Sequence, residues 1–147
     1  MNHGTIAGKP LSDGQMKDIE FGWELALEMG RLDVGQSVCV KGRAVLAVEA
    51  VEGTDECIRR AGELCPSGGF TIVKVAKPNQ DMRFDVPTVG LGTIETMAAE
   101  GGRILAIEAN KTILLDREEL ACAADRYGIK IVAFHNPEQG FSTSRAA

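Results

Sequence analysis

Apolar and polar positions alternate along the chain with two different periods, and together they predict an α/β fold. Apolar residues three or four positions apart predict helices at 15–31, 54–64, 93–100 and 117–127. Short runs rich in valine, isoleucine and alanine predict strands at 37–40, 44–50, 70–76, 104–107, 112–115 and 129–134. We therefore expect a mixed β-sheet of about six strands flanked by about four helices, without the regular alternation of a doubly wound fold.

Local signals refine several of these elements. The turn Lys41-Gly42 predicts a hairpin between the first two strands, and 70–76, apolar on both faces, is typical of a central strand. Thr54 is a candidate N-cap, and a turn near 110–111 separates the strands 104–107 and 112–115. Gly128 is the expected stop of the last helix.

The ends of the chain show little periodicity. Glycine and proline make 1–14 a predicted flexible lead-in and 136–147 a predicted flexible tail, which leaves 15–135 as one domain. No stretch has the pattern of a signal peptide or approaches the roughly 20 apolar residues of a membrane helix. We expect a cytoplasmic protein with at most peripheral contact to the inner face of a membrane.

The net charge and the positions of the cysteines limit the classes of partner and site to expect. The net charge of -5 does not suggest a nucleic-acid partner. The four cysteines, at 39, 57, 65 and 122, form no CxxC pair, so we expect reduced thiols rather than disulfides or a zinc site. His3 and His135 stand near the chain ends, and a histidine-based triad is not expected.

One polar stretch, 77–90, interrupts the apolar pattern between Pro78 and Pro87. In an extended segment Asp81, Arg83 and Asp85 share one face. Such a face suits either a metal and phosphate site or a local salt bridge on an edge segment. The two aspartates would lie about 13 Å apart in a straight strand, so they cannot hold one ion unless the segment bends.

Other charged residues extend this candidate site. Glu49 and Glu52 follow a strand, and Asp55 begins a helix, where carboxylates suit Mg²⁺. Lys74 either reaches a phosphate or is solvated on the sheet face, and both interpretations stay open. Gly53-Thr54-Asp55 either meets an anion or forms an ordinary N-cap. Spacing alone thus indicates a candidate metal and phosphate site in an α/β domain.

Several longer motifs carry a resemblance to a known family. They are Asp33-Val-Gly-Gln-Ser-Val, Ala47-Val-Glu-Ala-Val-Glu-Gly-Thr-Asp55, Ile58-Arg-Arg-Ala-Gly62, Lys74-Val-Ala-Lys-Pro-Asn-Gln-Asp-Met-Arg-Phe-Asp85 and Leu114-Leu-Asp116. From about Leu11 to Phe134 the chain resembles the C-terminal catalytic domain of the LpxI-type UDP-2,3-diacylglucosamine pyrophosphatases. The resemblance implies an α/β fold and metal-dependent cleavage of that substrate to UMP and 2,3-diacylglucosamine 1-phosphate, on the route to lipid A.

The resemblance also implies roles for individual residues. Asp85 is the first choice for the essential carboxylate, with Asp81 and Arg83 as further catalytic residues. The expected phosphate-binding or substrate-binding residues are Lys74, Lys77, Gln80, Gly53, Thr54 and Arg59. The expected ligands of Mg²⁺ (or Mn²⁺) are Asp85, Asp55, Glu49 and Glu52.

One departure from the family pattern leaves alternatives open. Family members carry a Rossmann-like N-terminal domain, with the substrate between the two domains, and we expect no counterpart of that domain in this chain. We expect a single-domain pyrophosphatase, or else a non-catalytic nucleotide-sugar or lipid-binding module, or half of a split enzyme. The expected partners are a UDP-2,3-diacylglucosamine-like lipid, a separate N-terminal domain protein or further copies of the chain. An exposed apolar patch is expected where another domain would dock.

Overall fold

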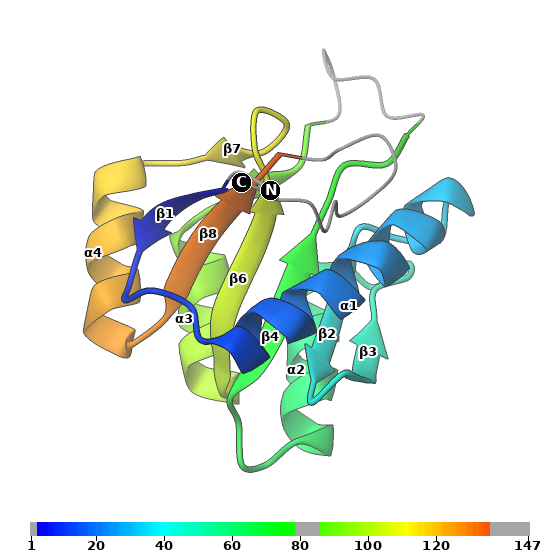
Figure 1. Cartoon of the computed structure of the whole chain (residues 1–147), viewed down its shortest axis with the longest axis horizontal. Coiled ribbons are helices and arrows are strands. Elements are labelled where there is room, and N and C mark those ends of the chain that lie inside the picture. Colours follow the sequence, from blue (N-terminus) through cyan, green and yellow to red (C-terminus); the bar gives the residue numbers. More distant parts are fainter. Residues whose placement is uncertain (1–2, 79–85, 136–147) are drawn as a thin grey trace.

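The computed structural model describes residues 3–78 and 86–135 (Figure 1). Its elements in chain order are β1 (His3–Ala7), α1 (Asp13–Arg31), β2 (Ser37–Lys41), β3 (Ala44–Val48), α2 (Thr54–Leu64), β4 (Phe70–Lys74), β5 (Thr88–Val89), α3 (Leu91–Glu100), β6 (Gly102–Glu108), β7 (Ile113–Leu114), α4 (Arg117–Tyr127) and β8 (Lys130–Phe134). Gln80, Asp81, Arg83 and Asp85 lie outside the described residues, as does the predicted tail.

Six strands form one mixed sheet in the order β1-β8-β6-β4-β2-β3, which confirms the predicted α/β class. The inner strands β4, β6 and β8 are parallel, and β1, β2 and β3 are antiparallel to their neighbours. All five residues of β4 are buried, so the predicted central strand is confirmed. The parallel strands β4 and β6 end at the same edge of the sheet, and this edge carries most of the candidate site.

Helices cover both faces of the sheet. In Figure 1, α1 crosses in front of the sheet, and α2 and α3 lie behind it. The core under α1 includes Trp23, whose ring meets Phe134 edge to face at 5.8 Å between centroids. The core on the other face joins residues of α2, α3 and α4 to the sheet, with Phe70 and Ile72 of β4 at its centre. Side chains at the end of β4 therefore alternate between the layer of α1 and the layer of α2, α3 and α4.

The start of α1 follows from its sequence. Ser12 is the N-cap: its hydroxyl accepts a hydrogen bond from the Gln15 amide, and the Gln15 side-chain oxygen accepts one from the Ser12 amide. This capping box satisfies two backbone donors that the first turn of a helix leaves without partners. The helix thus begins at Asp13, two residues before the predicted start.

The predicted flexible lead-in is wrong for residues 3–7, which form the edge strand β1. β1 pairs antiparallel with β8, Ala7 is buried, and the Gly8 amide donates to the Asp125 carboxylate at 3.0 Å. An edge strand needs one partner only, and a run this short shows no period in the sequence.

The strand after the turn at 109–111 also differs from the simplest expectation. Asn110 takes a left-handed conformation (φ 65°), and the Lys111 amide donates to the Glu108 carbonyl. β7 then leaves the main sheet and pairs in parallel with β5 as a separate two-stranded sheet. The pairing involves two residues on each side, too few for a sequence pattern.

Candidate functional site

Lys74, the last residue of β4, is the centre of the described part of the site. Its register partner in β2 is Ser37, and Lys74 is only 7% exposed. Its ammonium donates a hydrogen bond to the Thr88 carbonyl at 3.2 Å. The sequence left open whether Lys74 is solvated or directed to a ligand; the structure places it inside, on the α2 and α3 side of the sheet.

Burial and two carboxylates act on the Lys74 ammonium in opposite directions. Burial lowers the pKa of Lys74 from its ordinary value, while the charges of Glu49 and Asp55 raise it again. An ammonium has three donors, and the Thr88 carbonyl takes one of them. A desolvated cation with donors to spare is well suited to bind an anionic oxygen.

Two helices begin beside Lys74. α2 begins after Gly53 and α3 begins after Gly90, and neither N-cap has a side chain that accepts a backbone hydrogen bond. Asp55 lies in the first turn of α2, and Thr88 stands two residues before Gly90. Unsatisfied backbone N–H groups and the positive end of the helix dipole both favour an anion at such a position.

A chain of three hydrogen-bonded side chains links β2, the residue after β3, and α2 at this edge. The Thr54 hydroxyl donates to Glu49 Oε1 at 3.1 Å and lies 3.3 Å from the Ser37 hydroxyl. Because Thr54 has one proton to give, Ser37 is the donor in the second bond. The prediction that Thr54 is the N-cap is wrong: Gly53 holds that position with φ 94°, and the Thr54 hydroxyl serves Glu49 instead.

Three other predicted site residues are engaged in ion pairs. Glu52 accepts from the Ala50 amide and from Arg60, and the bond to Arg60 lowers the pKa of Glu52. Arg59 is exposed and pairs with Glu56 one turn earlier on α2. Lys77 pairs with Asp33 at 3.0 Å. The structure thus brings together Lys74, Thr54, Glu49 and Asp55. Glu52, Arg59 and Lys77 each form an ion pair with another charged side chain.

The metal-ligand prediction extends beyond the described residues. Within 3–78 and 86–135, no group of three or more His, Cys, Asp or Glu side chains could hold a metal ion. Glu49 and Asp55 are half-buried and both act on Lys74. Two carboxylates suit Mg²⁺, which takes one or two from the protein and keeps water or phosphate oxygens for the rest.

The sequence reasoning missed Glu108, the last residue of β6. Its side chain is only 1% exposed, and Oε1 accepts a hydrogen bond from the Ala76 amide at 2.9 Å. Oε2 is buried and accepts no hydrogen bond from the residues that the structure describes; the Lys111 ammonium lies 3.9 Å away, too far to donate. The available signal was an acid that directly continues the apolar run 104–107.

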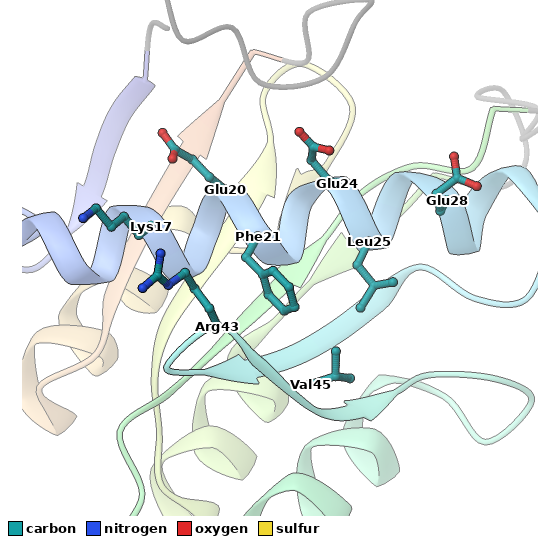
Figure 2. A pocket seen from close by; sticks show the side chains of 8 residues that line it. All are labelled: Lys17, Glu20, Phe21, Glu24, Leu25, Glu28, Arg43 and Val45. Carbon is teal, nitrogen blue, oxygen red and sulfur yellow. The ribbon is translucent and has the colours of Figure 1, made fainter.

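A separate groove lies on the other face of the molecule, between α1 and the edge strand β3 (Figure 2). Its volume is about 670 Å³. In Figure 2, Phe21 and Leu25 of α1 point toward the side where Val45 of β3 lies, and Glu20 and Glu24 point away from Val45 on the other side of the helix. Phe21 is 36% and Val45 44% exposed. The groove therefore offers an apolar surface well away from the α2 side where Lys74 lies.

No helix among the described residues is both long and apolar enough to cross a bilayer.

Together these features define an α/β domain with a buried cation and two helix starts at the carboxyl edge of its parallel strands. Comparison with known proteins gives the family. The model of the LpxI C-terminal domain matches residues 2–132, and the chain belongs to this family, as its motifs indicated.

Two curated proteins illustrate the relationship. UDP-2,3-diacylglucosamine pyrophosphatase LpxI of Caulobacter vibrioides is 37% identical over 131 residues, covering 84% of this chain and 47% of the relative. The UPF0597 protein GSU1527 of Geobacter sulfurreducens is 32% identical over 92 residues, covering 61% of this chain and 21% of the relative. The chain thus spans about half the length or less of the curated relatives that it matches.

Proposed function

We propose that the chain hydrolyses the pyrophosphate bond of UDP-2,3-diacylglucosamine, releasing UMP and 2,3-diacylglucosamine 1-phosphate for lipid A synthesis. Family membership and 37% identity to an LpxI pyrophosphatase support the reaction class. The observation that carries the proposal is the buried Lys74 ammonium beside the starts of α2 and α3. A phosphoryl group is the anion that such a combination suits best.

The described residues have different roles in the proposed binding of the phosphoryl group. Lys74 donates to a non-bridging phosphoryl oxygen, where it neutralises charge that builds up as water attacks phosphorus. The free N–H groups after Gly53 and Gly90 donate to further oxygens of the same group. Ser37 and Thr54 keep Glu49 in a fixed orientation through their hydrogen bonds.

A divalent cation, Mg²⁺ or Mn²⁺, belongs to the proposal. Glu49, Asp55 and Asp85 are the residues that would hold it, and it would supply charge neutralisation at the pyrophosphate. Glu52 stays a predicted ligand, although its carboxylate already serves Arg60 and the Ala50 amide. Asp85 is the proposed essential carboxylate, with Asp81 and Arg83 beside it in the sequence.

A second function is a binding module, or one half of a split enzyme that needs a separate N-terminal domain protein. One observation favours it: the groove of Figure 2 presents an exposed apolar floor. Either function places the chain at a lipid substrate, and we propose the cytoplasm, with peripheral membrane contact at most, as its location.

Release of UMP from UDP-2,3-diacylglucosamine in the presence of Mg²⁺ or Mn²⁺ separates the two functions. The hydrolase predicts release by the wild type and loss of release in Asp85→Ala and Lys74→Met. Lys17→Met is the matched control, because Lys17 is an exposed lysine on the groove side and its loss should leave turnover unchanged. Binding of the substrate without release, restored to turnover by an added N-terminal domain, would establish the split enzyme instead.

A further inference from the structure

We propose that Glu108 is a positioning residue for the proposed reaction, acting on the end of β4. The proposal rests on the proposed function, since it assigns Glu108 to that same site. Glu108 closes β6, and its carboxylate contacts β4 at Ala76, two residues after Lys74. From here the chain runs through Lys77 and Pro78 toward the segment that contains Asp81 and Asp85.

The contact with Ala76 stands where the two parallel strands separate. The β4–β6 register runs from Phe70 opposite Gly102 to Lys74 opposite Ile107. Beyond that point the Ala76 amide takes its acceptor from the Glu108 side chain rather than from a strand carbonyl. Glu108 thus fixes the backbone from which Lys74 and Lys77 extend.

Holding the Ala76 amide does not require the negative charge of Glu108. A glutamine at this position would offer the Ala76 amide the same kind of acceptor oxygen without a charge. Glu108 instead buries a carboxylate whose Oε2 accepts no hydrogen bond within 3–78 and 86–135, which is costly in a protein interior. Buried polar atoms without partners are rare in native proteins.

Lys111 does not account for this charge. Its ammonium is 3.9 Å from Oε2, and the lysine side chain is 52% exposed. Because the lysine is half-exposed and the two charged atoms are 3.9 Å apart, this ion pair contributes little to stability. A purely structural role therefore leaves the buried charge on Oε2 unexplained.

β7 and the residue after it also contact the chain at 87–89. The Ile113 amide donates to the Pro87 carbonyl, and the Leu115 amide donates to the Val89 carbonyl. Lys74 adds its own bond to Thr88 in the same stretch. Residue 76 is therefore held by the end of β6, and residues 87–89 are held by the end of β4 and by β7. A change at Glu108 is thus expected to reach Lys74 through the end of β4.

Glu108→Gln separates a positioning role from a structural one, because the two predict opposite results. The variant keeps an acceptor for the Ala76 amide and removes the buried charge. We expect an unchanged or higher urea midpoint, read from the fluorescence of the single tryptophan, Trp23. We also expect kcat to fall by about 10–100-fold with KM little changed, the loss typical of a misplaced reacting group. The affinity for Mn²⁺, measured by electron paramagnetic resonance, gives a readout that does not need turnover.

Two further variants interpret the result. Glu95→Gln removes an exposed carboxylate and should leave both stability and turnover as in the wild type. Lys111→Met should not reproduce the loss of kcat; if it does, Oε2 serves Lys111 alone and the proposal fails. A lower urea midpoint in Glu108→Gln with wild-type kcat and Mn²⁺ affinity would make Glu108 purely structural and overturn the proposal.

Failure of the proposed function gives a different pattern. If the wild type neither turns over nor binds substrate, the pyrophosphatase proposal fails, and the urea midpoints still decide the role of Glu108. A raised midpoint in Glu108→Gln would then show a carboxylate kept at the expense of stability for another ligand. A lowered midpoint would show a structural residue.

Discussion

Replacing Thr54 by valine tests the hydrogen-bonded chain that fixes Glu49. Valine has nearly the shape of threonine, so the change removes the hydroxyl and opens no cavity. It deletes the bonds at 3.1 Å to Glu49 and at 3.3 Å to Ser37. In the variant, the half-buried Glu49 carboxylate can accept a hydrogen bond from water instead. Ser37 is only 1% exposed, so its hydroxyl is left buried without the Thr54 partner.

The size of the effect follows from those two bonds. A typical hydrogen bond contributes about 0.5–1.5 kcal/mol net, and a buried group left without a partner costs about 1–3 kcal/mol. We expect Thr54→Val to lower the free energy of unfolding by about 1.5–3 kcal/mol. In a protein of this size that corresponds to a fall in Tm of about 3–12 °C. Urea unfolding followed by Trp23 fluorescence measures it directly.

Two controls complete this experiment. Thr54→Ser keeps the hydroxyl and loses one methyl group, so most of the stability should return. Thr96→Val removes a hydroxyl that bonds only to the Gly92 carbonyl of its own helix, at 3.0 Å, and should change stability by less than about 0.5 kcal/mol. A Thr54→Val protein as stable as Thr96→Val would refute the argument that this chain of bonds holds Glu49.

Three further predictions concern charge, packing and thiols. Because the pKa of Lys74 is lowered in the folded state, the unfolded chain binds more protons than the folded one as the pH approaches 10.5. The free energy of unfolding of the wild type should therefore rise over that pH range relative to Lys74→Met, as measured in paired urea titrations. A Cβ at Gly35 would lie 1.9 Å from the Glu49 carbonyl oxygen, so Gly35→Ala should lower the free energy of unfolding in urea by about 1–3 kcal/mol. A Cβ at Gly92 would meet open space, so Gly92→Ala should be neutral or stabilising. With a colorimetric thiol reagent, exposed Cys122 should react quickly and the three buried cysteines only after denaturation; equal rates for all four would contradict the buried placement.

Local sequence patterns predicted the elements whose signals are also local. β4 has an uninterrupted apolar run, the hairpin of β2 and β3 has a glycine turn, and α4 ends at Gly128 with φ 72°. Each of these needs only neighbouring residues to specify it. The strand β1 was missed because its single partner, β8, lies more than a hundred residues further along the chain.

The candidate site was predicted in part for the same reason. Glu49, Thr54 and Asp55 form one short motif, so their proximity follows from the sequence. The burial of Lys74 depends on β2 and β6 lying on either side of β4, which no local pattern contains. Glu108 was missed because an acid at a strand end usually meets solvent, and only the position of Ala76 places it inside.

The most direct test of the central claim, that Lys74 and the adjacent helix starts bind a phosphoryl group, is calorimetric titration with 2,3-diacylglucosamine 1-phosphate. It applies to a complete hydrolase and to a binding module alike. We predict binding by the wild type and by Lys17→Met, and at least about tenfold weaker binding by Lys74→Met, since a desolvated charge-assisted hydrogen bond contributes about 1.5–3 kcal/mol. Equal affinity of Lys74→Met and the wild type would contradict the claim.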